Sequence, residues 1–289
     1  MTAMFVLVIG GTKGGVGKTT VVANLGGIAA DAGLRVVMLD LDIQPTLSSY
    51  FKLEWRAPCG IYELLAFNES RLDELICHTS IRHLDLVLSN DDQNQLNTLL
   101  LHAPDGRLRL RNLLSMFSPH YDLMLIDTQG ARSVMLEMAI LAADEVLSPV
   151  TPEILAAREL QRGTLKLLRD LAPYQYLAIP SPPLHILINR VHPVSANARL
   201  IQQTLREIFN NQPAIQVLNT VVPALEAYPR AAMQWQAVHR VETQRPAGRM
   251  APAALETMRA LASELFPQWQ HRFEGVCRKK SGRSGHADR

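Results

Sequence analysis

Cysteine is scarce in this sequence of 289 residues, and the three that occur, Cys59, Cys77 and Cys277, lie far apart. An odd and widely spaced set argues against a disulfide framework or a zinc site and favours a reducing compartment, so we expect a cytoplasmic protein. No apolar run reaches the roughly 18 residues that a membrane-spanning helix needs. The N-terminal segment MTAMFVLVIGG has no basic region before its apolar residues, which predicts a strand rather than a signal peptide.

A strong excess of one charge is also missing, because the net charge is only +2. This balance hides a basic end: residues 268–289 carry a net charge of +4, and residues 1–267 carry about −2. We therefore expect one domain, residues 1–267, followed by a basic, partly disordered tail, residues 268–289. Such a tail can contact nucleic acid or an anionic membrane, or it can simply be a solvated end.

Seven short apolar runs alternate with longer helical patterns. The runs are FVLVI (5–9), RVVML (35–39), LDLVL (84–88), YDLMLID (121–127), EVLSPV (145–150), LHILINRV (184–191) and IQVLNTVV (215–222). Several are apolar along their whole length, which is typical of strands that are covered on both faces. The alternation predicts an α/β fold with a single doubly wound, mostly parallel sheet and helices on both faces.

The first run leads into GGTKGGVGKTT, residues 10–20, and then into a helical pattern. A glycine-rich turn between a strand and a helix directs backbone N–H groups at one point, with the helix dipole behind them, and this suits a phosphate. The expected nucleotide contacts are Gly14, Gly15, Val16, Gly17, Lys18, Thr19 and Thr20. Lys18 would reach the β and γ phosphates, and the Thr19 hydroxyl would bind Mg²⁺. The strict pattern G-x-x-x-x-G-K-[ST] fails only at Thr12.

The stretch KGGVGKTT resembles the deviant phosphate loop of the ParA/MinD ATPases, and this likeness extends over roughly residues 4–266. In that family the position of Thr12 varies. The resemblance implies a homodimer in the ATP state, in which Lys13 crosses the interface to the partner's nucleotide. There it would offset charge on the transferred phosphoryl group, as an arginine finger does. The alternative is an ordinary surface lysine. The DTQGA that follows the acidic strand resembles ParA-like proteins of integrative and conjugative elements.

Three aspartates at strand ends complete the expected catalytic centre. LDLDIQP resembles the family's D-x-D-P-Q switch, which implies that Asp40 holds a magnesium-bound water and that Asp42 activates the attacking water. Ile43 replaces the usual proline, so the switch backbone can differ, and Asp42 could instead merely cap the next element. Asp127 is the expected acidic residue behind the magnesium. Gly130 of D-x-x-G resembles a γ-phosphate sensor.

The base is expected to be adenine, because no N-K-x-D segment for guanine is present. Asn189 and Pro223 resemble adenine-contacting positions of relatives. ATP and Mg²⁺ are therefore the implied cofactors.

The cargo stays open between two main hypotheses, and other cargo-positioning roles are a further alternative. In the first, the ATP dimer binds duplex DNA of the nucleoid without sequence preference, partitions DNA, and is reset when a ParB-like partner stimulates hydrolysis. The segment VETQRPAGRMAPAALETMRALASELF resembles the family's DNA-contacting region. The candidate DNA contacts are Arg240, Arg245, Arg249, Arg259, Arg278, Lys279 and Lys280. For each of them the alternative is a solvated helix face.

The second hypothesis is a MinD-like ATPase that cycles on and off a membrane and positions a protein cargo. Trp269, Phe273 and Val276 fall on one helical face of PQWQHRFEGVCRKK, beside basic residues, and could lie in an anionic membrane surface. Gly275 interrupts this stretch. The aromatic residues could instead pack on the domain as an end cap.

Overall fold

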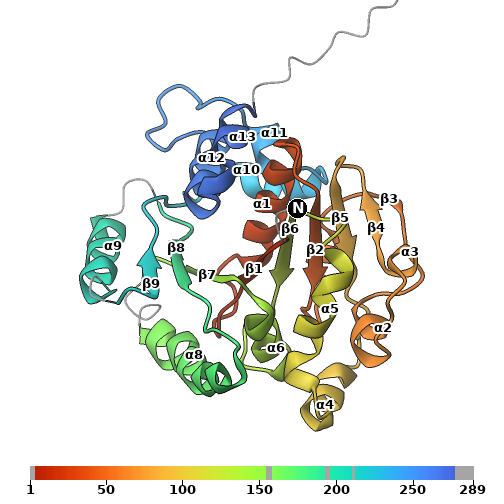
Figure 1. Cartoon of the computed structure of the whole chain (residues 1–289). Coiled ribbons are helices and arrows are strands. Elements are labelled where there is room, and N and C mark those ends of the chain that lie inside the picture. Colours follow the sequence, from red (N-terminus) through yellow and green to blue (C-terminus); the bar gives the residue numbers. More distant parts are fainter. Residues whose placement is uncertain (1–3, 154–157, 193–195, 210–211, 277–289) are drawn as a thin grey trace, which may run out of the picture.

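The computed structural model describes residues 4–153, 158–192, 196–209 and 212–276. Within these residues nine strands form one sheet in the order β3-β4-β5-β2-β6-β1-β7-β8-β9 (Figure 1). The strands are β1 (Phe5–Ile9), β2 (Val36–Asp40), β3 (Leu53–Trp55), β4 (Cys77–Thr79), β5 (Leu84–Val87), β6 (Leu123–Asp127), β7 (Glu145–Val150), β8 (Leu184–Ile188) and β9 (Ile215–Val217).

The sheet is parallel from β5 to β9, and only the edge strands β3 and β4 pair antiparallel. Every one of the seven expected runs contains or overlaps a strand, which confirms the expected fold class. The edge pair β3 and β4 was missed, because each strand has three residues and neither forms an apolar run.

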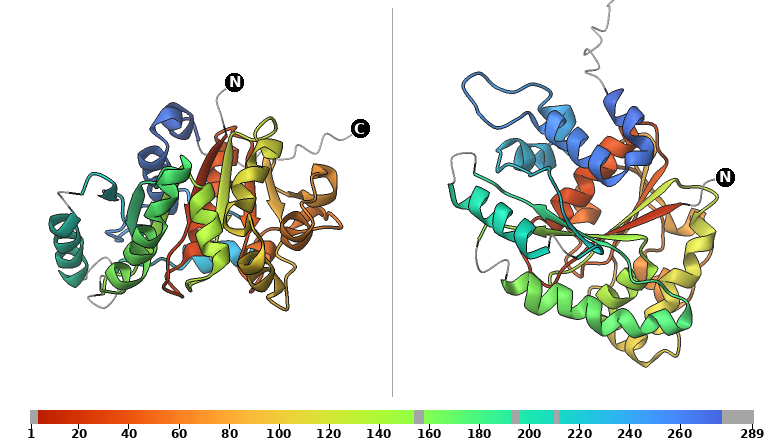
Figure 2. Two further views of the ribbon diagram at one scale, coloured as in Figure 1. Left: turned by 60° about the horizontal axis from the view of Figure 1, so that its bottom comes forward. Right: turned by 60° about the vertical axis from the view of Figure 1, so that its left-hand side comes forward.

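Helices cover both faces of the sheet (Figure 2). They are α1 (Lys18–Asp31), α2 (Ile61–Ala66), α3 (Leu72–Leu75), α4 (Gln95–His102), α5 (Arg109–Phe117), α6 (Val134–Ala142), α8 (Lys166–Leu171), α9 (Ala196–Phe209), α10 (Ala227–Met233), α11 (Val238–Val241), α12 (Ala254–Leu265) and α13 (Gln270–Glu274). The core has two halves: α1 and α10 to α13 pack on one face, and α4, α5, α6, α8 and α9 pack on the other. Burial on both faces explains why the central strands are apolar throughout.

The C-terminal helix packs on the domain and does not project from it. Phe273 is fully buried, and its ring lies 6.2 Å from that of Phe266. Trp269 makes an edge contact with Phe5 of β1. The fold therefore continues to Val276, beyond the boundary expected after residue 267, and the aromatic residues form an end cap. Among the described residues, no helix is long and apolar enough to cross a bilayer.

Candidate active site

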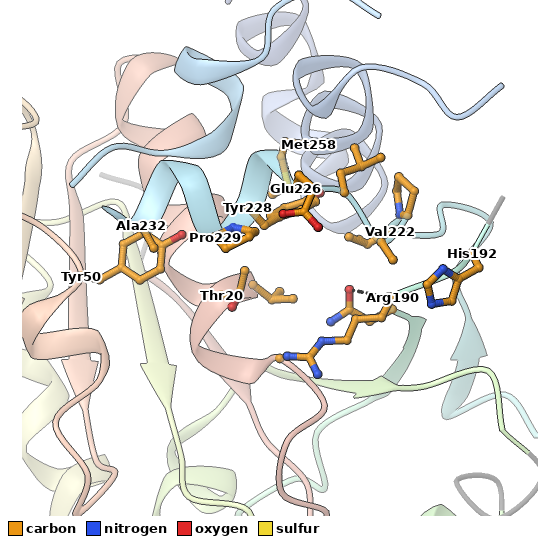
Figure 3. Close-up of a pocket in the computed structure, with 16 residues that line it drawn as sticks. Thr20, Tyr50, Arg190, His192, Val222, Glu226, Tyr228, Pro229, Ala232 and Met258 are labelled. Atoms are coloured by element: carbon orange, nitrogen blue, oxygen red, sulfur yellow. Dashed lines mark hydrogen bonds between the residues drawn. The ribbon is translucent and has the colours of Figure 1, made fainter. Parts of the chain in front are cut away.

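The expected nucleotide and metal residues come together at the carboxyl ends of β1, β2, β6 and β8, the edge where parallel α/β sheets bind ligands. Two adjoining clefts lie there. The phosphate cleft, about 590 Å³, is lined by residues of the loop, the Asp42–Thr46 switch and the Thr128–Ala131 turn. The base cleft, about 580 Å³, lies between the start of α1, the Asn189–His192 turn and the segment around α10 (Figure 3).

The phosphate loop follows β1 directly and ends at the first residue of α1. Gly15 and Gly17 have φ values of 72° and 89°, a left-handed conformation that favours glycine. The Lys18 ammonium donates a hydrogen bond of 3.0 Å across the loop to the Lys13 carbonyl oxygen. Burial lowers the pKa of Lys18, while the carboxylates of Asp127 and Asp42 oppose this fall. The Lys18 side chain therefore spans the loop to the Lys13 carbonyl group, and its charge interacts with those of Asp127 and Asp42.

Thr12 stands where the strict pattern has glycine, and its side chain packs against Gly163, which lies far along the chain. A Cβ on Gly163 would lie 1.8 Å from the Thr12 hydroxyl oxygen, so the threonine occupies the space that Gly163 leaves. The Thr12 N–H also donates to the Thr164 hydroxyl at 3.3 Å. Gly163 and Thr164 belong to a widened turn of π-helix, Gln161–Leu165, just before α8. The absence of a side chain at Gly163 thus leaves room for a threonine where the strict pattern has glycine.

Asp40 and Asp127 are paired neighbours on β2 and β6, and both are fully buried. Asp40 accepts hydrogen bonds from the Ser48 N–H at 2.8 Å and the Ser48 hydroxyl at 2.7 Å. Burial raises the pKa of Asp40 to about 6, and the Ser48 bonds oppose the rise. Burial raises the pKa of Asp127 to about 8, the nearby Asp40 adds to this, and the Thr19 hydroxyl counteracts it. The protonated form is thus favoured more strongly at Asp127 than at Asp40.

The Asp127 carboxylate is suited to bind a cation. Neither of its oxygens accepts a hydrogen bond from a described residue in proper geometry, which is costly for a buried polar group. Carboxylate and hydroxyl oxygens are the donors that Mg²⁺ prefers, and a divalent cation reverses the charge balance of an acidic cluster. The site therefore fits a magnesium ion that Thr19, Asp127 and, through water, Asp40 would hold.

Asp42 and the switch backbone also line the phosphate cleft. Asp42 accepts from the Gln44 N–H at 3.1 Å, and its carbonyl oxygen accepts from the Ser89 hydroxyl at 2.6 Å. Ser48 in turn accepts from the Ser89 N–H at 2.9 Å. These contacts fix the switch although Ile43 has replaced proline. Neither serine was identified from the sequence, since an isolated serine carries no motif.

Gly130 lies against the phosphate loop. A Cβ there would approach the Gly14 Cα to 2.4 Å and the Gly14 nitrogen to 2.6 Å, so no other residue fits. The preceding Thr128 donates to the carbonyl oxygen of Ile9 at 3.1 Å, which holds the turn on β1. The γ-phosphate sensor role of Gly130 stays a prediction, but its place beside the loop is the one such a role requires.

Asn189 braces the phosphate loop in addition to lining the base cleft. Its amide nitrogen donates to the Val16 carbonyl oxygen at 2.7 Å, and its amide oxygen accepts from the Arg190 N–H at 2.9 Å. Pro223 lines the base cleft, together with the rings of Tyr50 and Tyr228 (Figure 3). Adenine contact by Asn189 and Pro223 stays a prediction.

Lys13 forms an ion pair within its own chain. Its ammonium lies 2.9 Å from the Glu159 carboxylate and 3.9 Å from that of Glu153, and its side chain is 31% exposed. The adjacent Gly14 and Gly15 are exposed, so the outer side of the loop faces solvent.

The candidate DNA contacts lie on the α11–α12 side, apart from the phosphate cleft. Arg240 forms an ion pair with Asp31 at 2.6 Å, and Arg249 forms one with Glu242 at 2.6 Å. Arg245 is exposed. The remaining candidates are Arg259, which is half-buried, and Arg278, Lys279 and Lys280, which lie outside the described residues. Two of the expected arginines thus already have acidic partners inside the domain.

Comparison with known proteins agrees with this geometry. The AAA_31 family model, an AAA domain, matches residues 4–172. A MinD-type septum site-determining protein of Guillardia theta is 32% identical over 216 residues, which is 71% of each chain. The chromosome partitioning protein ParA of Myxococcus xanthus is 32% identical over 160 residues, 55% of this chain and 56% of that one. The ATP complex of a Cyanothece McdA variant has the same fold, with a TM-score of 0.71 at 22% identity over 96% of both chains.

The family model covers more than half of the chain, and the MinD relative matches most of it. These matches agree with the phosphate loop, the switch and the three aspartates found at one edge of the sheet. The chain belongs to the ParA/MinD family of P-loop ATPases.

Proposed function

We propose that this ATPase dimerises on Mg-ATP, binds duplex DNA without sequence preference, and partitions or positions DNA. A ParB-like partner would then reset it by stimulating hydrolysis. The observation that carries the proposal is the position of Lys13. This lysine lies at the solvent-facing edge of the phosphate loop, whereas Lys18 of the same loop lines the phosphate cleft of its own chain.

The hydrolytic chemistry is assigned to residues of the phosphate loop and of the switch, which both line the phosphate cleft. Bound magnesium supplies charge to offset the phosphate oxygens, and Lys18 adds a second cation from the loop. Asp42, held by Ser89 through its backbone, is the group in place to orient a water toward the γ-phosphate. Its carboxylate accepts only a backbone N–H from Gln44 in the described chain, so it keeps acceptor capacity for a water.

The proposed dimer rests on the exposed outer side of the phosphate loop in the single chain. With Gly14 and Gly15 exposed, a γ-phosphate on the loop would face solvent on its outer side. A second protomer would exclude that water, and its Lys13 would bring a cation to the phosphoryl group. Lys13 must first leave Glu159, which links dimer formation to breaking a contact within each chain.

DNA is favoured over a membrane as the cargo surface by the packing of the C-terminal helix. Phe273 is fully buried and Trp269 lies on Phe5, so this face is already used by the domain. The membrane alternative then depends on the basic residues that follow Val276. The match to MinD keeps it as the second candidate.

Sedimentation with random-sequence duplex DNA and with anionic liposomes, each in ATP and in ADP, tests the proposal. We expect ATP-dependent DNA binding that weakens steeply with salt. It should be lost in Lys18→Ala and retained in Lys52→Ala, which removes an exposed lysine away from the site. Lys13→Ala should bind ATP but fail to dimerise. Binding to liposomes and not to DNA would refute the DNA proposal in favour of the membrane alternative.

A further inference from the structure

Arg190 occupies the junction of the two clefts. It lines both the phosphate cleft and the base cleft, and its side chain lies near the start of α1 (Figure 3). Its Nε is 3.7 Å from the point where a Cβ on Gly17 would lie, so the guanidinium rests over the last glycine of the phosphate loop. No sequence motif indicated this arginine.

The backbone holds Arg190 there at a cost. Its φ is 58°, a left-handed conformation that is unfavourable for a residue with a side chain and that tends to occur at functional sites. One amide fixes both parts of the contact, since Asn189 accepts from the Arg190 N–H and donates to the Val16 carbonyl oxygen. The arginine and the phosphate loop are thereby held in register.

The charge of Arg190 is available to a ligand. Whereas Arg240 and Arg249 pair with carboxylates, no described carboxylate forms an ion pair with the Arg190 guanidinium. A guanidinium presents donors in a planar fork that matches phosphate oxygens. Carboxylates already surround the magnesium end of the phosphate cleft, so a free cation at its other end suits an anion.

We propose that Arg190 binds the α-phosphate of the nucleotide, an inference that rests on the nucleotide binding assigned above. Gly17 and Thr20 line both clefts, so the phosphate chain must pass them as it leaves the base cleft. The first phosphate on that path is the α-phosphate, whereas Lys18 reaches the β and γ phosphates. Arg190 would therefore set the position at which the chain enters the loop.

Affinities of the full chain for adenosine, AMP, ADP and ATP, measured by competition with a fluorescent ADP, test this assignment. Arg190→Gln should weaken AMP, ADP and ATP by about 10- to 100-fold, the range expected for one charge-assisted hydrogen bond. Adenosine should bind as it does to the wild type. The matched control is Arg82→Gln, which removes an exposed arginine before β5 and should change none of the four affinities.

Arg190→Gly separates binding from folding. Glycine adopts the left-handed conformation without strain, so this variant should melt at or above the wild-type temperature and yet lose affinity as Arg190→Gln does. Unchanged affinity for AMP in Arg190→Gln, or an equal loss with adenosine, would overturn the α-phosphate assignment. A wild-type chain that binds no nucleotide would instead refute the ATP site itself.

Discussion

Asp127→Asn should make the metal-free protein more stable at neutral pH while abolishing ATP hydrolysis. The carboxylate is fully buried, neither of its oxygens accepts a well-formed hydrogen bond from a described residue, and its pKa is raised to about 8. The folded state therefore binds a proton that the unfolded chain releases near pH 4. Under proton linkage, the free energy of unfolding falls as pH rises between these two values, and an asparagine has no such dependence.

The size of the effect follows from the pKa. Each pH unit between about 4 and 8 costs the wild type about 1.4 kcal/mol relative to the variant. From pH 5 to pH 7 the difference in unfolding free energy should therefore grow by about 3 kcal/mol, or about 5 °C in melting temperature for a chain of this size. Urea denaturation with EDTA, followed by tryptophan fluorescence, measures it.

Added Mg²⁺ with ADP provides a further test of the raised pKa of Asp127. Mg²⁺ with ADP should reduce the pH dependence of the wild type and leave that of Asp127→Asn unchanged, because the cation replaces the proton. A difference between the two proteins that stays constant from pH 5 to pH 7 would show that Asp127 does not carry a raised pKa, and the magnesium assignment would lose its main support.

Other substitutions test other parts of the site. Gly130→Ala should cost about 1 to 3 kcal/mol in stability and most nucleotide affinity, since its Cβ meets loop backbone at 2.4 Å; Gly275→Ala, with no contact under 3.4 Å, should change neither in the same melting and binding assays. Glu159→Gln should raise the fraction of dimer in ATP several-fold on a sizing column, because the loop lysine is released from a 2.9 Å ion pair; an unchanged fraction would mean that this pair does not oppose dimerisation. Arg245→Gln should weaken DNA binding more than Arg240→Gln in a salt titration, because, of these two arginines, Arg240 alone forms an ion pair with a described carboxylate; the reverse order would place the DNA elsewhere.

The sequence was sufficient to predict the framework of the sheet, since strands buried on both faces are apolar throughout. It was not sufficient for the edge pair β3 and β4, whose three-residue strands depend on their neighbours rather than on their own pattern. Residues 196–209, which form α9, carry a strong amphipathic pattern that is recognisable in the sequence alone. No pattern in the sequence indicates the π-helical turn before α8, where Gly163 packs on Thr12 of the loop.

Some residues of the site could be predicted from the sequence and others could not. The loop and Asp40, Asp42 and Asp127 were recognisable because chemistry fixes their spacing. Ser48 and Arg190 were not, because each acts through a position that the fold creates. The roles of the late arginines also could not be judged from the sequence, since their acidic partners are brought to them by the fold.

The contact between Thr12 and Gly163 has an evolutionary consequence. The two residues lie far apart in the chain but share a space too small for two side chains. We therefore expect them to covary among relatives: a larger residue at the position of Gly163 should occur where the loop has glycine in place of Thr12. Enlarging Gly163 first would create a clash with Thr12, whereas Thr12→Gly first removes it, so the order in which the two changes arise would decide which loop sequences a lineage can reach.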